Sequence, residues 1–443
     1  MLKTINAHAA AIDVGSEQLY VAVVDQAVQV FDTFTESLHA LCGALLDAGV
    51  TTVAMEATGV YWLPVYEVLE AAGLEVYVVN GAHVKSLPGR KSDMQDCQWL
   101  AELHSLGLLR SGFVPPQTIR RLRDYQRLRQ DHIRMGSAHI QHMQKALDRM
   151  NLKIHDVLSD LTGLSGMRLV EAILNGVRDR HVLLELCDVQ IVRHKRAAML
   201  KALDGNGRTE HLFALRQAHQ GWEFYQQQIA ACDRQIQGVL EELVAQAPPS
   251  PAPGGGGGGG AAPKRLHHHA PQIAELHTLL LRLNAGQDLG ALPALSDYSV
   301  LQLLGEVGTD MRRWPTAKHF TAWLGLAPSS RQSGKRRRRE KRFRNHAGQI
   351  FCVVARSLAR SKHLALGGFY RRLRAMHGGQ LANVATARKI AVLFYNTLRF
   401  GLAYVEQGLE RYEAAYRHQR LRSLQRNARE FGLTLVPATQ ANG

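Results

Sequence analysis

The sequence has few cysteines, and no pattern joins them. Its five cysteines are scattered along 443 residues, and no two form a CxxC pair. This usage is typical of a reducing cytosol and argues against a disulfide framework or a zinc knuckle. The first residues also lack the charged segment and apolar run of a secretory signal. No uninterrupted apolar run approaches the roughly 18 residues that span a bilayer, so we expect a soluble, cytoplasmic protein.

Acidic residues are outnumbered by basic ones. The chain has 54 Lys and Arg against 38 Asp and Glu, a formal net charge of +16. An excess of this size favours a polyanionic partner, usually nucleic acid, over a merely basic soluble protein. The length suggests two or three domains, and a hydrophobic content of 46% is enough to bury their cores.

Residues 8–80 alternate short apolar runs with amphipathic stretches. Three consecutive strands, a helix, and then alternating strands and helices predict a mixed α/β sheet. We expect strands at 8–14, 19–25, 28–34, 51–56 and 74–80, and helices at 36–48 and 61–72.

The pattern becomes helical after residue 116. Residues 118–150 carry one apolar stripe on an otherwise basic helix, which must bury that stripe on another helix, in the chain or across a dimer. Helices continue through 156–245. Seven consecutive glycines in 248–263 predict a flexible linker. A compact helical unit at 290–400 and a basic helical tail follow.

Four carboxylates stand out by their place in these elements. Asp13 and Glu56 come at the ends of the first and fourth predicted strands. Asp93 and Asp96 lie three residues apart at the start of a helix and so face the same way. Carboxylates at strand ends and on a neighbouring helix can converge on one point. Two Mg²⁺ ions roughly 4 Å apart would neutralise them, an arrangement suited to phosphodiester chemistry.

Each carboxylate also has an ordinary structural interpretation. Asp93 could cap a helix, Asp96 could favour the positive end of that helix, and Asp13 could take part in a turn. A charged residue at the end of an otherwise apolar strand is harder to explain in this way, and it occurs twice.

A dense run of basic residues follows residue 330. It places nine positive charges in fourteen residues against one acid, Glu340. The members are Arg331, Lys335, Arg336, Arg337, Arg338, Arg339, Lys341, Arg342 and Arg344. A solvated face or a disordered arm is the alternative. Because the run lies between apolar helices rather than at a terminus, it favours a phosphate-gripping surface.

Ser333, followed by Gly334, stands at the start of this run. A serine hydroxyl is a poor nucleophile at neutral pH, but surrounding cations and a metal can lower its pKa and stabilise a pentacoordinate phosphate. Ser329 and Ser330 are nearby alternatives, and spacing alone does not choose among the three.

Taken in order, these motifs resemble the DEDD transposases of bacterial insertion sequences, the IS-one-ten family. The resemblance rests on AIDVGSEQLYVAVV with Asp13, VAMEATGVYW with Glu56, and GRKSDMQDCQWLAEL with Asp93 and Asp96. It resumes in FTAWLGLAPSSRQSGKRRR and in ARKIAVLFYNTLRFG, and it covers most of the chain outside 248–275.

The resemblance implies a fold and a division of the chain. The N-terminal domain is similar to the RuvC resolvase, an RNase H-type α/β fold, and the C-terminal transposase domain is mainly helical. With the pattern above, it gives a RuvC-like DEDD catalytic domain, a helical coiled-coil region, a flexible linker, a transposase domain with the serine, and a basic helical tail. Their ranges are 1–115, 116–247, 248–275, 276–405 and 406–443.

The resemblance also implies a mechanism. Asp13, Glu56, Asp93 and Asp96 bind Mg²⁺, and Ser333, which aligns with the family's SG motif, attacks the DNA backbone to form a covalent phosphoserine. A bridge RNA pairs with target and donor DNA, and the tetrad of one subunit completes the serine site of another within dimers and tetramers. The helix at 118–150 and the arginine run are then expected to contact RNA and DNA, on the nucleoid.

Two other functions stay open from the residues. A RuvC-like structure-selective nuclease would need the four acids but not Ser333. A non-catalytic nucleic-acid-binding protein would need only the basic surfaces. Substitution of Ser333 separates the first of these from a serine recombinase, and substitution of Asp13 separates both enzymes from simple binding.

Overall fold

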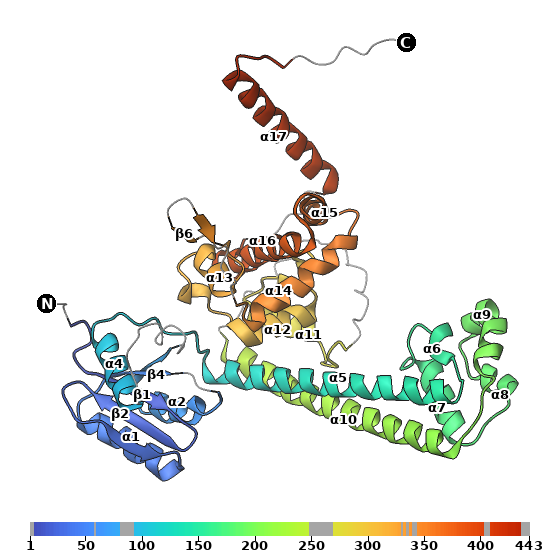
Figure 1. Cartoon of the computed structure of the whole chain (residues 1–443), viewed down its shortest axis with the longest axis horizontal. Helices are drawn as coiled ribbons and strands as arrows, with labels where there is room; N and C mark the ends of the chain where they lie inside the picture. The colour runs from blue at the N-terminus through green and yellow to red at the C-terminus, as the bar shows by residue number, and fades with distance from the viewer. Residues whose placement is uncertain are drawn as a thin grey trace. The chain divides into compact units, whose positions relative to one another are not determined.

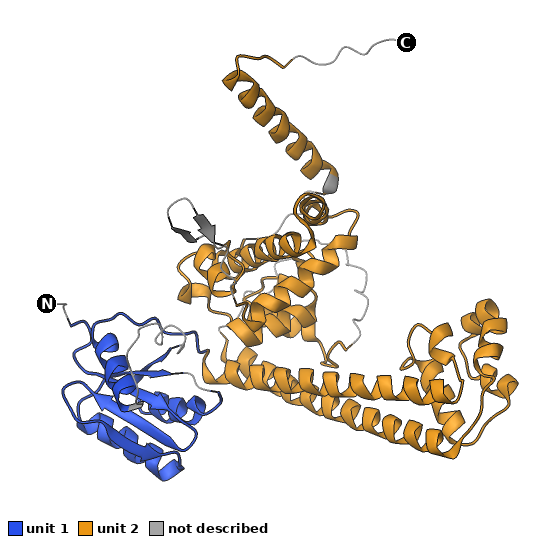
Figure 2. Cartoon of the chain, in the orientation of Figure 1, with its two compact units in different colours: residues 1–114 blue, residues 115–443 orange. Residues whose placement is uncertain are grey.

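The computed structural model describes residues 4–56, 59–79, 93–247, 269–328, 331–333, 336–338, 343–402 and 408–435, with the backbone alone at 93, 331–333, 336–338 and 409. The chain divides into two compact units, Met1–Val114 and Pro115–Gly443 (Figure 2). Within the described ranges, no helix is long and apolar enough to cross a membrane.

The first unit contains a five-stranded mixed sheet with the strand order β3-β2-β1-β4-β5. β1 pairs antiparallel with β2 and parallel with β4; β2 and β3 are antiparallel, and β4 and β5 are parallel. The strands are β1 (Ala9–Val14), β2 (Gln18–Val23), β3 (Gln29–Asp32), β4 (Thr52–Glu56) and β5 (Glu75–Val79). The predicted mixed α/β sheet is confirmed, and each strand overlaps a predicted range, with β2 beginning one residue before its range at Gln18.

Helices cover both faces of this sheet. Ile12 and Met55 face a core that includes side chains of α1 (Thr35–Asp47) and α2 (Trp62–Ala71). In Figure 1, α4 (Asp93–Ser105) lies on the opposite face of the sheet. Small residues such as Ala11 and Ala54 pack against it there. Because side chains alternate along a strand, the even-numbered residues of β1 pack in the core with α1 and α2, and Ala11 packs in the core with α4.

Small side chains let α4 lie close to the strands. The Cys97 thiol donates to the backbone oxygens of Ala11 at 3.4 Å and Tyr20 at 3.0 Å. At the other end of α4, the buried His104 ring lies 2.9 Å from the Thr52 hydroxyl, and burial lowers the pKa of His104 to about 4. His104 is therefore neutral at physiological pH, and α4 is fixed to the sheet at both ends.

The second unit is built around two long antiparallel helices. α5 (Gln117–Arg149) confirms the predicted helix, and α10 (Thr209–Gln246) packs along it (Figure 1). Arg121 contacts Glu242, and Arg129 contacts Asp233. Residue numbers increase in opposite directions along the two helices, which are therefore antiparallel. Leu122, Met143 and Leu147 of the apolar stripe of α5 are buried within the chain, whereas Leu128 is 46% exposed.

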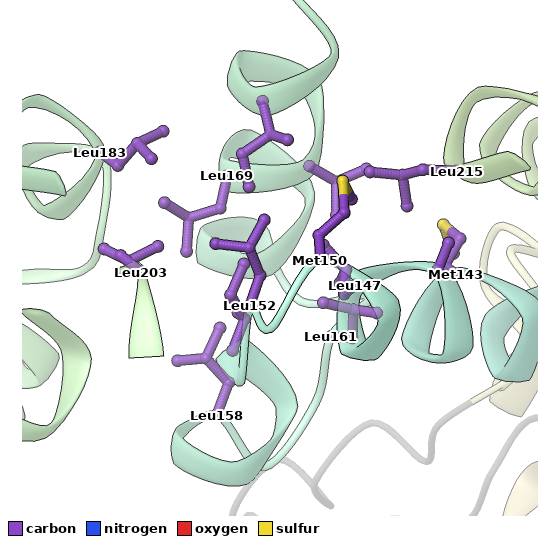
Figure 3. Packing of buried hydrophobic residues seen from close by; sticks show 14 of the residues in the cluster. Met143, Leu147, Met150, Leu152, Leu158, Leu161, Leu169, Leu183, Leu203 and Leu215 are labelled. Carbon is purple, nitrogen blue, oxygen red and sulfur yellow. The ribbon is translucent and has the colours of Figure 1, made fainter. Parts of the chain in front are cut away.

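The far end of this helical pair is closed by four shorter helices. They are α6 (Ile154–Val157), α7 (Leu164–Leu174), α8 (Arg180–Glu185) and α9 (Val189–Ala202). Met143 and Leu147 of α5 and Leu215 of α10 join side chains such as Leu169 and Leu183 in one apolar core (Figure 3). This core gives the two long helices a fixed end.

The C-terminal part is mainly helical, as predicted. Its elements are α11 (Leu276–Leu283), α12 (Asp297–Val307), α13 (Ala317–Trp323), β6 (Arg331–Ser333), β7 (Arg336–Arg338), α14 (His346–Ser357), α15 (Ala365–His377), α16 (Gly379–Phe400) and α17 (Leu409–Glu430), with short 3-10 turns at Leu289–Ala291, Met311–Arg313 and Leu358–Arg360. Phe320, Phe351 and Phe394 form an aromatic centre that joins α13, α14 and α16.

Candidate active site

Asp13 and Glu56 lie at the same end of two neighbouring strands. β1 and β4 run parallel with Ile12 opposite Met55, and each acid is the next residue on its strand. Alternation places both carboxylates on the face that carries Ala11 and Ala54. Both are half-buried. Two acids from strands that are distant in sequence thus share one edge and one face of the sheet.

That face is the one that α4 covers, and α4 carries the other two candidate acids. Asp96, which is half-buried, directly precedes Cys97. Asp93 begins the helix one turn before Cys97, and its side chain lies outside the described part. The local pattern that predicted an acidic first turn therefore begins a helix on the same side of the sheet as Asp13 and Glu56.

The negative charge of Asp13 affects the pKa of the Cys97 thiol. Burial is the main cause that raises the pKa of Cys97 to about 12, and the negative charge of Asp13 raises it further. Hydrogen bonding to the backbone of Asp13 and Ala22 acts in the opposite direction. Cys97 therefore stays a neutral thiol, and the carboxylate of Asp13 acts electrostatically on the second turn of α4.

No metal site is formed by the side chains that the structure describes. Among them, no three His, Cys, Asp or Glu groups lie close enough together to hold an ion. Asp93, the fourth member of the tetrad, is not among these side chains. Convergence of all four carboxylates stays a prediction, while the shared face of Asp13 and Glu56 is a feature of the fold.

The serine and the start of the arginine run lie on a short antiparallel pair of strands. Ser333 of β6 is opposite Arg336 of β7, and Arg331 is opposite Arg338. The local pattern did not predict this strand pair. The other candidates in the run, apart from Arg344, have no described side chain: Arg337 has backbone only, and Lys335, Arg339, Lys341 and Arg342, like Ser329 and Ser330, lie outside the described residues.

The chain that leaves these strands is held firmly where α14 begins. Asn345 caps α14 by accepting a hydrogen bond from Gly348 N at 2.9 Å, and its amide donates to the Trp323 carbonyl at 3.1 Å. A Cβ on Gly348 would lie 2.1 Å from the Leu324 carbonyl oxygen, so only glycine permits this approach. The exit of the strand pair is thereby pinned to the end of α13.

A buried carboxylate ties the same segment to the long helix α5. Glu306 of α12 is 7% exposed and receives two hydrogen bonds from Arg127, at 3.0 and 2.9 Å. His346, the first residue of α14, lies 2.9 Å from it. Burial alone would raise the pKa of Glu306, but His346, Arg127 and Arg123 outweigh it and hold the pKa at about 2. Glu306 is therefore a fixed negative charge.

Two arginines in the first half of α5, Arg123 and Arg129, bind partners within the protein. Arg123 donates to the backbone oxygens of Gly305 at 3.2 Å and Glu306 at 2.8 Å. Arg129 is 2% exposed and paired with Asp233. The expectation that this basic helix contacts nucleic acid is wrong for Arg123 and Arg129, because both are committed to partners within the fold. No local signal in the sequence could have identified Glu306 and Asp233 as those partners.

Arg344 is the one member of the arginine run whose side chain is described. It is half-buried, and its guanidinium lies 4.0 Å from the Cys352 sulfur on α14. Its carbonyl accepts a hydrogen bond from Gln349 at 3.3 Å. Arg344 therefore lies against α14, next to the pinned start of that helix.

Two family models match the chain. Residues 10–152, from β1 to the end of α5, match the IS110 DEDD model, which is described as a transposase. Residues 287–371, which include the serine strands, Glu306 and His346, match the model described as Transposase IS116/IS110/IS902 family. No curated protein matches the chain.

Both matched regions describe the same class of protein, a transposase, whose substrate is DNA. Together they cover just over half of the chain and contain every candidate acid and the serine. The two matches support membership of the IS110 family of insertion-sequence transposases.

Proposed function

We propose that this transposase cuts and rejoins DNA with a Mg²⁺-binding tetrad, Asp13, Glu56, Asp93 and Asp96, on a RuvC-like domain, and with Ser333 as a separate nucleophile. The observation that carries this proposal is the placement of Asp13 and Glu56 at the same end of adjacent parallel strands, beneath the helix that begins with Asp93. If Asp13 and Glu56 had only structural roles, nothing would require both of them to lie on the same face of the sheet.

The donor set fits a divalent metal ion with a preference for oxygen ligands. Carboxylates are the groups that Mg²⁺ takes from proteins, and bound Mg²⁺ would stabilise charge on phosphate oxygens in the transition state. The neighbouring Cys97 thiol is directed to the backbone oxygens of Ala11 and Tyr20, and Mg²⁺ prefers oxygen ligands to sulfur.

The covalent step is a displacement at phosphorus. The Ser333 Oγ forms a bond to the phosphorus atom and loses its proton, while the bond to the departing sugar oxygen breaks and that oxygen takes up a proton. The phosphoserine keeps the energy of the broken link, so a second DNA hydroxyl can later displace the serine and rejoin the strand. Cations of the arginine run hold the non-bridging phosphate oxygens.

The described surroundings of the serine strands support a fixed approach to the phosphate. The cap by Asn345, the contact at Gly348 and the Glu306 cluster anchor the segment that follows the run. A nucleophile must be held close to the reacting geometry, and anchors of this kind reduce the entropy lost on approach. We further propose that a bridge RNA selects target and donor DNA, and that subunits assemble as dimers or tetramers.

The experiment is a search for a protein–DNA adduct. Purified protein is incubated with Mg²⁺, RNA from its flanking region, and labelled donor and target DNA, and then resolved on a denaturing gel. We expect an adduct that disappears in Ser333→Ala and persists in the matched variant Ser330→Ala. Asp13→Asn should also abolish it while DNA binding is retained.

Other outcomes point elsewhere. Clean cleavage without an adduct, unchanged by Ser333→Ala, would establish a RuvC-like nuclease and reject the serine mechanism. Loss of the adduct in Ser330→Ala alone would move the nucleophile to that serine. DNA binding without cleavage or adduct in the unaltered protein would leave only a binding role.

A further inference from the structure

The last described helix, α17, is attached to the C-terminal part by two tyrosines. Tyr412 and Tyr416 lie one turn apart. The Cζ atom of Arg372, on α15, lies 5.0 Å from the ring centroid of Tyr412 and 3.7 Å from that of Tyr416. Burial raises the pKa of Tyr412, and the positive charge of Arg372 opposes this rise. Both tyrosines are half-buried, whereas from Arg417 to Glu430 every residue except Ala428 is exposed. One end of the helix is therefore anchored and the rest faces solvent.

The exposed surface of α17 carries a regular row of basic side chains. Steps of seven, four, four and three residues place them on one face of a helix. The row consists of Arg411, His418, Arg422, Arg426 and Arg429. Successive members of the second half are about 4.5–6 Å apart along the axis. Tyr412 and Tyr416 are on a different face, so the anchor leaves this basic row exposed.

We propose that α17 is a DNA-binding arm whose basic row lies along the phosphate backbone of the duplex. The inference rests on the proposed function, because it takes DNA as the substrate, but it involves neither the tetrad nor Ser333. The four arginines of this row, on an exposed helix, match the charge of a polyphosphate chain. Such contacts position the protein on DNA without reading sequence.

The remaining faces of α17 favour DNA over a lipid surface. The exposed Leu421 and Leu424 lie on the side of the helix that also carries Arg417 and Arg420. A helix that lies in a membrane interface needs a continuous apolar face opposite its charges. In α17 that face is interrupted by two arginines, whereas the basic row contains no acid. The three acids of the helix, Glu410, Glu413 and Glu430, are at its ends.

The test compares two double variants of the full chain with equal charge loss on the same helix. Arg422→Gln with Arg426→Gln removes part of the row, and Arg417→Gln with Arg420→Gln removes two arginines from the other side. Affinity for a 30-base-pair duplex of unrelated sequence is measured by fluorescence anisotropy in EDTA, over a range of salt concentrations. A duplex RNA and anionic vesicles are parallel probes.

For the row variant we expect about tenfold weaker DNA binding and a salt slope that is lower by about two. The other variant should bind as the unaltered protein does. Tyr416→Ala should weaken binding without loss of charge, because it frees the anchor. Equal effects of the two double variants, no effect of either, or a loss confined to RNA or vesicles would overturn the inference. Absence of DNA binding by the unaltered protein would instead reject the proposed function.

Discussion

Arg129 and Asp233 form the most deeply buried ion pair among the described residues, and the pair joins α5 to α10. The guanidinium Nε lies 2.6 Å from one carboxylate oxygen, and both side chains are at most 3% exposed. Tyr298 and the backbone N of Gln272 complete the cluster. A second pair, Arg121 and Glu242, joins the same helices at the surface. The two pairs differ mainly in burial, and burial decides how much the loss of each pair changes the free energy of unfolding.

At the buried pair, Asp233→Asn should lower the free energy of unfolding by about 3–5 kcal/mol. The substitution keeps the shape but leaves the Arg129 charge buried without its counterion. The matched variant Glu242→Gln breaks the exposed pair and should cost at most about 1 kcal/mol. Urea unfolding followed by circular dichroism measures both. Equal losses would contradict a role for burial.

At the scale of elements, two helical glycines have opposite surroundings. Gly348 in the first turn of α14 faces the Leu324 carbonyl, and an added Cβ would lie 2.1 Å from its oxygen. Gly238 in α10 is exposed, and an added Cβ would meet nothing within 4 Å. The same substitution therefore tests a tertiary contact in one helix and helix propensity in the other.

Gly348→Ala should destabilise the protein by about 1–3 kcal/mol, because the backbone at the end of α13 must move away. Gly238→Ala should stabilise it by about 0.5–1 kcal/mol, because alanine loses less entropy in a helix. Thermal unfolding gives both shifts. If Gly348→Ala were as harmless as Gly238→Ala, the segment after the arginine run would not be pinned to α13 as described.

At the scale of the whole molecule, the candidate acids and the candidate serine belong to different compact units. Asp13 and Glu56 lie in Met1–Val114, and Ser333 lies in Pro115–Gly443. The family resemblance implies that the tetrad of one subunit completes the serine site of another. This arrangement can be tested by mixing two variants that are each inactive alone.

A mixture of Asp13→Asn and Ser333→Ala proteins should form the DNA adduct that neither forms alone. In a mixed assembly, the intact tetrad of the Ser333→Ala chain can serve the intact serine of the Asp13→Asn chain. Chains of different length identify which one is labelled, and the adduct is expected on the Asp13→Asn chain. A mixture that binds DNA but gives no adduct would reject the shared site.

Local pattern was sufficient to predict most elements of this protein. Alternating apolar residues identified β1 and β4, and the apolar stripe identified α5 within a residue or two of its ends. The candidate acids Asp13 and Glu56 also came from local pattern, as charges at strand ends. These features depend on residues close in sequence, because the periodicity of a strand or helix is set by the order of neighbouring residues.

Only the tertiary structure decided which charges meet. Arg129 pairs with a residue 104 positions away, and Arg127 with one 179 positions away. The local pattern therefore predicted a basic helix that contacts nucleic acid, whereas Arg123 and Arg129 are held inside the fold. Position in sequence determines the face of an element that a side chain occupies, whereas its partner depends on how elements pack. That packing also leaves the basic row of α17 exposed, because the two tyrosines on another face hold the helix.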